Sequence, residues 1–328
     1  MRAALLFLFL LLALLAACSS ADEDPAPSTP TEISTGAKPW GVAVDAGRGR
    51  AYTANEGENT VSIIDLEQGL AIQTIPAQTG PSSIAVNHET GFVYVTHAFA
   101  DTVGVIDPET GDLVATIAVE SSPWAIDVDE EANLIYVANA EGDSVSVIDG
   151  VTNTVVATIT GVEEPWGVEA APGLGLIYVS SAASGQVIEF DAVAGTVTRR
   201  FDAEDRPRGL TLDLAANLLY VANVESGSVT VVDLDSGEAI AIVPVESAPL
   251  TVVLDTANGR AYVANSFSAS ISVIDTAVNE VIDTLPVAAN PWDLAVGPDG
   301  TLYVASSGGS RLTVFPPGAL GATASTGN

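Results

Sequence analysis

Short runs of alternating apolar and polar residues recur along this chain, and they lack the spacing of an amphipathic helix. In a representative stretch, residues 124–129, 134–138, 145–149 and 155–160 form four such runs, with turn-forming residues between them. Alternation with a period of two over five or six residues predicts β-strands, and the short connections predict antiparallel neighbours. Each group of four runs therefore predicts one four-stranded antiparallel sheet.

The whole pattern returns every 42 residues, and a proline marks each return. Behind each proline come an apolar run, a turn, a Tyr-Val pair or a variant of it, and Val-Ile-Asp or a close variant. A fixed period in the forties is typical of β-propeller blades, which bury their two faces only by stacking on each other. We therefore predict an all-β fold over residues 33–316, a seven-bladed β-propeller of four-stranded antiparallel blades. The marker prolines are Pro39, Pro81, Pro123, Pro165, Pro207, Pro249 and Pro291.

The two ends of the repeat region complement each other. The last unit has only three strand-like runs before Pro316, and residues 32–36 resemble the end of a fourth strand. The N-terminal segment is therefore predicted to be the missing strand of the last blade, which leaves no unpaired edge at the seam. Residues 317–328 are predicted to be a flexible C-terminal tail.

The N-terminal residues predict export and lipid anchoring. Residues 1–17 carry one positive charge and a continuous apolar stretch, which is typical of a signal peptide and too short for a membrane span. The run that ends at Cys18, Leu-Ala-Ala-Cys, resembles a bacterial lipobox, so Cys18 is the expected lipidation site; an ordinary cleavage site beside an unrelated cysteine is the alternative. Residues 18–32 then form an acylated, disordered tether. We expect the cell envelope, with membrane contact only through the lipid, and Ser19 favours an outer membrane.

Charge narrows the class of partner. The sequence has 42 acidic and 10 basic residues, a net charge of −32, and Cys18 is its single cysteine. A body this acidic repels phosphate backbones, so no nucleic-acid partner is expected. The acidic residues either form a solvated surface that keeps copies of the protein apart, or they attract cations or a basic partner. Acylation of Cys18 would leave no thiol for a disulfide, a nucleophile or a metal site.

A family resemblance rests on the second strand of the repeat. Four of these strands carry nearly the same tetrapeptide, and each is followed by Val-Ile-Asp or a variant. They resemble the YVTN-type β-propeller repeat, whose members include surface-layer proteins, periplasmic propellers and relatives of propeller lactonases and dehydrogenase subunits. The resemblance covers roughly residues 33–315 and implies the propeller fold. The tetrapeptides are Tyr94-Val95-Thr96-His97, Tyr136-Val137-Ala138-Asn139, Tyr220-Val221-Ala222-Asn223 and Tyr262-Val263-Ala264-Asn265.

All four tryptophans stand directly after a marker proline, at Trp40, Trp124, Trp166 and Trp292. This position belongs to the propeller face on which ligand sites usually lie, near the central channel. The indoles either wedge between neighbouring blades and donate to a loop carbonyl, or stack on a sugar, a quinone or a cation. Packing devices repeat whereas binding sites are asymmetric, so the repetition favours packing. The four residues are also candidate ligand-binding residues at the channel mouth.

Basic residues break the symmetry in the fifth unit. Arg208 replaces the tryptophan, Arg206 lies two residues earlier, and Arg199-Arg200 ends the preceding strand. Arg206 and Arg208 are candidate ligand-binding residues that would form an anion-accepting spot at the channel mouth. The alternative is ion pairing with the nearby acids Asp202, Glu204 and Asp205.

The residue that ends the second strand is asparagine in four units, and it is predicted to cap the backbone of the following loop. His97 is the outlier of this column and a candidate ligand-binding residue. The only other histidine, His88, is expected on the opposite face, so the two cannot share a metal ion. We predict no metal, no cofactor and no catalytic residue. The aspartates predicted to cap the turn after each third strand are Asp65, Asp107, Asp149, Asp191, Asp233 and Asp275.

These observations favour a lipid-anchored, monomeric propeller that serves as a non-catalytic scaffold for an envelope protein, a glycan or a small ligand. The alternative is a lactonase-like hydrolase at the channel mouth, which would use His97, Arg208 and nearby acids. An accessory subunit of a redox system is a third hypothesis, for which the sequence has no cofactor motif.

Overall fold

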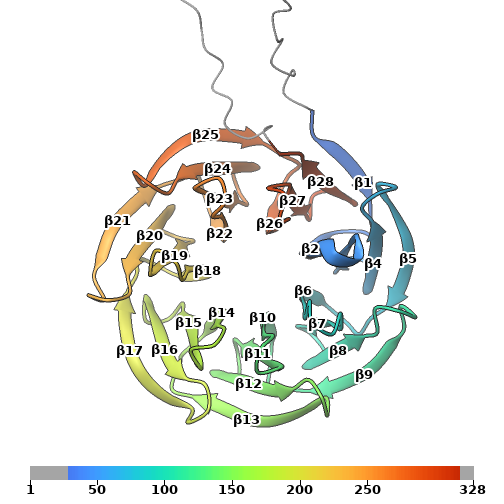
Figure 1. The fold of residues 1–328 in the computed structure, drawn as a ribbon, viewed down its shortest axis with the longest axis horizontal. Coiled ribbons are helices and arrows are strands. Elements are labelled where there is room, and N and C mark those ends of the chain that lie inside the picture. The colour runs from blue at the N-terminus through green and yellow to red at the C-terminus, as the bar shows by residue number, and fades with distance from the viewer. Residues whose placement is uncertain (1–28, 318–328) are drawn as a thin grey trace, which may run out of the picture.

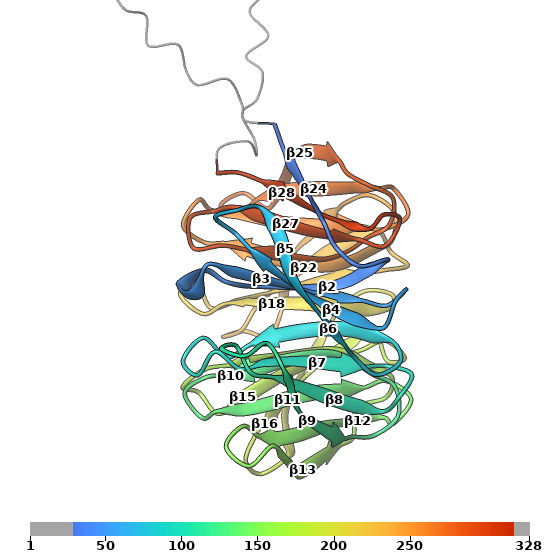
Figure 2. The ribbon, with the colours of Figure 1, turned by 90° about the vertical axis from the view of Figure 1, so that its right-hand side faces the viewer.

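In the computed structural model, which describes residues 29–317, the chain forms a closed ring of seven four-stranded antiparallel sheets (Figure 1). This confirms the predicted seven-bladed propeller. Figure 2 shows the ring from its edge, with the blades following one another in sequence order. The predicted signal peptide, Cys18 and most of the tether and the tail lie outside the described residues. Within residues 29–317, no helix is long and apolar enough to cross a membrane.

Strands occupy equivalent positions in all seven blades, numbered here outward from the axis. The first strands are β2 (Pro39–Asp45), β6 (Pro81–Val86), β10 (Pro123–Asp129), β14 (Pro165–Ala171), β18 (Pro207–Asp213), β22 (Pro249–Asp255) and β26 (Pro291–Val296). The second strands are β3 (Arg50–Asn55), β7 (Val93–His97), β11 (Leu134–Asn139), β15 (Leu176–Ser181), β19 (Leu218–Asn223), β23 (Arg260–Asn265) and β27 (Leu302–Ser306).

The third strands are β4 (Thr60–Asp65), β8 (Thr102–Ile106), β12 (Ser144–Asp149), β16 (Gln186–Asp191), β20 (Ser228–Asp233), β24 (Ser270–Asp275) and β28 (Arg311–Phe315). The outermost strands are β5 (Leu70–Pro76), β9 (Leu113–Ala118), β13 (Thr154–Thr160), β17 (Thr196–Asp202), β21 (Ala239–Pro244), β25 (Glu280–Pro286) and β1 (Thr31–Ser34). A 3-10 turn, η1 (Ala46–Arg48), follows β2.

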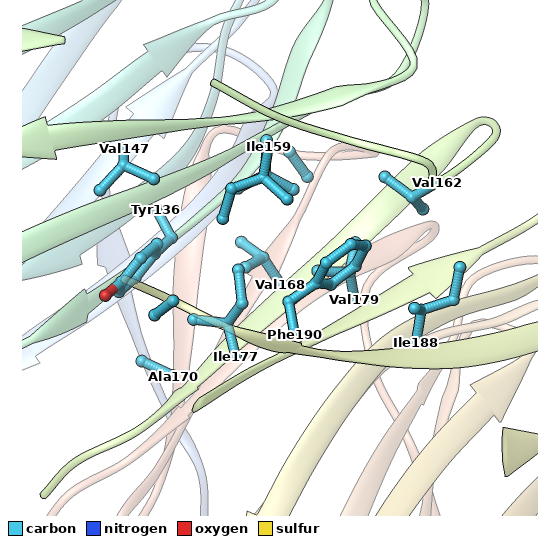
Figure 3. Packing of buried hydrophobic residues seen from close by; sticks show 13 residues of the cluster. Tyr136, Val147, Ile159, Val162, Val168, Ala170, Ile177, Val179, Ile188 and Phe190 are labelled. Atoms are coloured by element: carbon cyan, nitrogen blue, oxygen red, sulfur yellow. The ribbon is translucent and has the colours of Figure 1, made fainter. Parts of the chain in front are cut away.

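The core consists of seven layers, each between two adjacent blades. In the layer between the third and fourth blades, Tyr136 and Ile159 pack against Val168, Ile177 and Phe190 (Figure 3). The tyrosine of the repeat is almost fully buried in every blade, because its ring fills the gap to the neighbouring sheet. Each sheet thus buries its two faces against its neighbours, as the stacking argument requires.

The ring is closed by β1, which pairs antiparallel with β28 and completes the sheet formed with β26 and β27. Ile33 lies opposite Leu312 and is buried in a layer that also contains Val42 of the first blade. The predicted closure by the N-terminal segment is confirmed.

Candidate functional site

The seven first strands surround a central cavity of about 310 Å³. Five of the strands line the cavity with the four residues that follow the marker proline. The first strand lines it with Trp40 and Val42, and the last strand with Trp292, Asp293 and Leu294. The tryptophans at the start of these strands bound one end of the cavity, and His88, which follows β6, lines it at the other end. The former end is called the channel mouth below.

Backbone geometry makes the channel mouth rigid. The residue before each marker proline has a positive φ, between 49° and 74°, and only one of the seven is glycine. In every blade the carbonyl of this residue accepts the N–H of the residue that follows the second strand, at 2.7 to 3.1 Å. The two loops of each blade are thereby tied together, and the side chain after the proline is held in place. The seven residues are Lys38, Gly80, Ser122, Glu164, Arg206, Ala248 and Asn290.

The four tryptophans gather into one cluster at the channel mouth. Trp40 stacks on Trp292 with ring centroids 4.6 Å apart and on Trp124 at 5.5 Å, and Trp124 stacks on Trp166 at 5.3 Å. The indoles thus pack on one another across the channel. Trp166 donates its indole N–H to the Glu164 carboxylate at 3.2 Å, whereas a loop carbonyl was expected as the acceptor.

Arg208 is part of this cluster. Its guanidinium carbon lies 4.5 Å from the ring centroid of Trp292 and 5.0 Å from that of Trp166, which places a cation against two aromatic faces. Burial lowers the pKa of Arg208 to about 10 and the Asp293 carboxylate opposes this shift, so the group stays charged at neutral pH. Gly167 permits the arrangement, because a Cβ there would collide with the Arg208 carbonyl.

Arg206 lies beside the cluster with its charge already paired. Its guanidinium is 2.8 Å from Glu164 Oε1 and 3.5 Å from Glu225 Oε1. Ion pairing of this arginine was expected with Asp202, Glu204 or Asp205, but its partners come from other loops. Arg199 and Arg200 are on the outermost strand β17, and Arg199 pairs with Glu189 at 2.8 Å.

His97 lies next to Pro81 in the sheet of the second blade but does not line the central cavity. It is fully buried at the end of β7, where Nδ1 lies 2.9 Å from the Thr102 hydroxyl. Burial lowers the pKa of His97 to about 4, so the ring is neutral. The asparagines of the same column donate to hydroxyl side chains of the third strand, as Asn139 does to Ser144 and Ser146, where a contact with the backbone of the following loop was expected. Asn223 in addition accepts a loop backbone N–H, that of Glu204, at 3.3 Å.

Carboxylates in the channel were missed by the sequence reasoning. Asp127 and Glu169 stand four residues after their prolines on the adjacent strands β10 and β14, and Asp293 lies on β26. Burial raises the pKa of Asp127 to about 6 and that of Asp293 to about 6. Burial and then the charge of Asp127 raise the pKa of Glu169 well above its ordinary value. The signal was available, because this position holds an acid in only two of the seven units.

Two phenylalanines on the same face were also missed. Phe99 is 55% exposed and stands edge-on to Trp40 and Trp124, with ring centroids 6.3 Å apart. Phe267 is 82% exposed and borders an apolar groove of about 240 Å³, together with Trp166, Leu250 and Trp292. Both follow the second strand of their blade by two residues, a position at which no other described blade has an aromatic residue.

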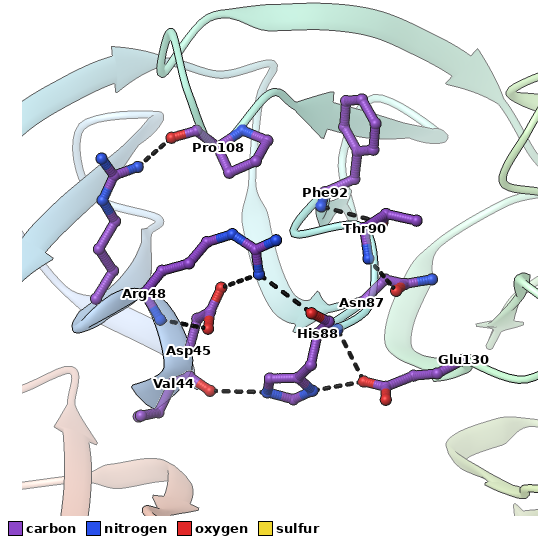
Figure 4. Close-up of polar contacts among 10 residues, drawn as sticks. Val44, Asp45, Arg48, Asn87, His88, Thr90, Phe92, Pro108 and Glu130 are labelled. Carbon is purple, nitrogen blue, oxygen red and sulfur yellow. Dashed lines mark hydrogen bonds and ion pairs between the residues drawn. The ribbon is translucent and has the colours of Figure 1, made fainter.

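The opposite face is held by polar contacts among the first three blades (Figure 4). His88 Nε2 lies 3.0 Å from the Val44 carbonyl, and Nδ1 contacts Glu130. Burial lowers the pKa of His88, but the Val44 and Glu130 contacts outweigh it and the net shift is upward. Arg48 joins Asp45 to the His88 carbonyl at 3.0 and 3.1 Å. These contacts have a structural role, because they link the first blade to the second and the second blade to the third.

Other predicted roles can be placed as well. The aspartates after the third strands accept backbone N–H groups of the following turn, as Asp149 does from Val151 and Thr152 at 2.7 and 2.9 Å, which confirms their capping role. Among residues 29–317, no group of three or more histidine, cysteine or acidic side chains is arranged to hold a metal ion.

The fold and this site define the class: a seven-bladed β-propeller with an aromatic cluster at the mouth of its channel. The model of the YNCE-like β-propeller family matches residues 91–258, and the chain belongs to that family. The predicted resemblance to YVTN-type repeats is thus confirmed in part, because the YNCE-like family is related to them. Comparison with curated proteins finds no match.

Among solved structures, the chain is similar to a chain of Kuenenia stuttgartiensis hydrazine synthase. The TM-score is 0.79 with 17% sequence identity, and the match covers 86% of this chain and 96% of that one. At this identity the likeness concerns the fold alone.

Proposed function

We propose that this protein is a non-catalytic binding module, and that its ligand or partner binds at the channel mouth. The observation that carries the proposal is the half-buried aromatic cluster of four tryptophans with the exposed Phe99 and Phe267 beside it. Exposed aromatic side chains on one rigid face are typical of interaction sites, because they bury much apolar area with little loss of side-chain entropy. The tied loops supply that rigidity.

The N-terminal sequence supports a place for this module in the cell. We propose that Cys18 is lipidated and anchors the propeller on the extracytoplasmic side of the envelope. The tether was predicted to span residues 18–32, but its last two residues, Thr31 and Glu32, belong to β1, so the tether would end before Thr31. A closed ring has no unpaired edge at its seam, which favours a monomer. An envelope protein, a glycan or a small ligand would then reach the channel mouth from the periplasm or the outside.

The test is a capture experiment from envelope extracts of the source cell. Wild-type protein is compared with a variant that combines Phe99→Ala and Phe267→Ala, two exposed side chains whose loss leaves the core intact. The control combines Val151→Ala and Val193→Ala, which are 80% and 89% exposed in turns of the opposite face. We expect a partner that the wild type and the control retain and the phenylalanine variant loses. Equal retention by all three proteins would refute a site at the channel mouth.

A lactonase-like hydrolase is the second candidate, and one observation favours it. Asp127 and Glu169 are adjacent carboxyl groups with raised pKa values inside the cavity, which is the arrangement that general acid–base catalysis needs. Hydrolysis of a panel of lactones, measured with and without added divalent metal, tests it. Activity that Glu169→Gln abolishes would favour the hydrolase over the scaffold.

A further inference from the structure

The groove beside Phe267 carries an inference about the partner, which rests on the proposed function. We infer that this groove accepts an apolar side chain of a basic polypeptide segment, whose lysines and arginines pair with the acidic loops around it. The occupant has two chemical requirements, and different residues of the structure set each of them.

The first requirement is an apolar anchor. The groove is formed by Trp166, Trp292, Leu250 and Phe267, together with the small apolar side chains of Val224 and Ala248. Its volume of about 240 Å³ is sufficient for one large side chain such as phenylalanine or leucine. Phe267 is 82% exposed at its border, so a guest side chain would cover a ring that now faces water.

The second requirement is positive charge beside the anchor. The residues that line the groove sit in loops that also carry acids: Glu225 follows Val224, and Glu246 lies two residues before Ala248. Both glutamates are exposed. The neighbouring loops add more acids, so the surroundings of the groove are strongly negative. These additional acids are Glu163, Glu164, Glu204 and Asp205.

The two arginines at the groove do not reverse this charge. Arg206 is paired with Glu164 and Glu225, and the guanidinium of Arg208 lies against the faces of Trp166 and Trp292. An anionic ligand would therefore have to displace existing ion pairs and approach an acidic rim. A cationic segment instead meets the carboxylates of Glu204, Asp205 and Glu246, for which the described residues supply no ion pair, and charge complementarity selects it.

The loops around the groove are also preorganised. Phe267 donates its N–H to the Ser247 carbonyl at 3.3 Å, which ties the loop that carries the anchor-binding ring to the loop of Glu246. Ser266 donates to Ala248 at 2.9 Å in the same pair of loops. The apolar and the acidic parts of the site thus keep a fixed spacing, which suits an extended peptide with alternating character.

Tryptophan fluorescence tests the inference directly, because all four tryptophans of the chain lie at the channel mouth. The probes are four synthetic compounds: a peptide with one phenylalanine flanked by lysines, the same peptide with serine in place of phenylalanine, a phenylalanine peptide flanked by glutamates, and a neutral oligosaccharide. We expect a saturable emission change with the first probe and at least tenfold weaker binding of the second and third. Binding of the first probe should weaken as salt is raised.

Variants locate the response. Phe267→Ala should weaken binding of the lysine-flanked phenylalanine peptide at least fivefold. The double variant Glu225→Gln with Glu246→Gln should also weaken binding of this peptide and should reduce the salt dependence of that binding. Val193→Ala and Glu238→Gln, which change exposed residues in turns of the opposite face, are the matched controls and should leave binding unchanged. Equal binding by Phe267→Ala and wild type would overturn the inference.

The probes also separate the two proposals. A response to the oligosaccharide or to the glutamate-flanked peptide alone would overturn the basic partner and leave a binding site at the channel mouth. The absence of any response, together with equal capture by all three proteins in the extract experiment, would overturn both.

Discussion

His97 and Gly104 show how a single residue pair adapts the repeat. In four blades an asparagine at the end of the second strand bonds a serine or threonine hydroxyl seven residues later, as Asn139 bonds Ser146 at 3.0 Å. In the second blade, His97 stands at the position of the asparagine and Gly104 at the position of the serine or threonine. The imidazole occupies the space of the missing side chain, since a Cβ on Gly104 would lie 2.8 Å from His97 Cε1. The histidine is therefore a packing substitution.

This pairing predicts a double-mutant result. Gly104→Ser should lower the free energy of unfolding by about 1–3 kcal/mol, because it overpacks a filled core. The same change in a His97→Asn background should cost less, because the asparagine–serine hydrogen bond of the other blades is restored. Chemical denaturation of the wild type, the two single variants and the double variant measures the coupling. Equal costs of Gly104→Ser in both backgrounds would contradict this account.

At the scale of the element, the first strands have two tasks. Residues that directly follow the proline line the channel, whereas residues further along the strand, such as Val128 and Ala170, pack between blades. On β10 and β14 the fourth residue after the proline is Asp127 and Glu169, respectively. Asp127 accepts the Ala170 backbone N–H at 2.7 Å, and Glu169 accepts the Thr211 hydroxyl at 3.4 Å. These bonds offset only part of the cost of two neighbouring carboxylates in a narrow channel.

The channel acids predict a pH dependence of stability. The folded-state pKa of Asp127 is raised to about 6, and that of Glu169 is raised as well. The folded state therefore favours the protonated carboxyl groups. The protein is most stable, as far as these two groups are concerned, below their unfolded-state pKa near 4, and it loses this stability as pH rises through the folded-state pKa values. Glu169→Gln should therefore raise the free energy of unfolding at pH 7.5 by about 1 kcal/mol, and the difference should disappear at pH 4. Melting temperatures across this pH range measure it.

Asp149→Asn is the control of opposite sign. Backbone N–H groups of Thr152 and Val151 lower the pKa of the Asp149 carboxyl, so its contribution is present at neutral pH and lost in acid. Its substitution should destabilise the protein at pH 7.5. A stabilising effect of Asp149→Asn, or a pH-independent effect of Glu169→Gln, would show that these carboxyl groups do not act as described.

At the scale of the whole molecule, stability depends on closing the ring. β1 lies near the start of the described residues and pairs with β28 near their end, and Ile33 packs with residues of the first and last blades. Thr313 also donates to the Glu32 carboxylate at 3.0 Å. Without β1, the third strand of the last blade would expose its edge and the adjacent layer would lose its outer wall.

Ile33→Asp should therefore destabilise the entire propeller. Burying a carboxylate without a partner in place of an isoleucine that is 6% exposed should cost about 3 kcal/mol or more and lower the melting temperature. Thr31→Asp, at an exposed position of the same strand, is the control. A melting temperature unchanged by Ile33→Asp would mean that the ring is stable without this strand.

The fold could be predicted from the sequence because the blade repeats. Each 42-residue unit contains its own turn signals and alternating strands, so local patterning determined the number of blades, the strand order and the missing strand supplied by residues near Ile33. The turn-capping aspartates were predicted for the same reason, because a side chain that bonds the next two or three residues is a local feature.

The site was only partly predictable, because it is built from residues in different blades. The sequence by itself determined that Trp40, Trp124, Trp166 and Trp292 share one position, and that Arg208 replaces a fifth. Only the tertiary structure decided that the indoles stack on each other across the channel, that Arg208 lies against two of them, and that His97 is buried. Ring closure brings together side chains separated by 42 residues or more, and contacts over such distances depend on blade tilt and side-chain packing, which no local pattern encodes.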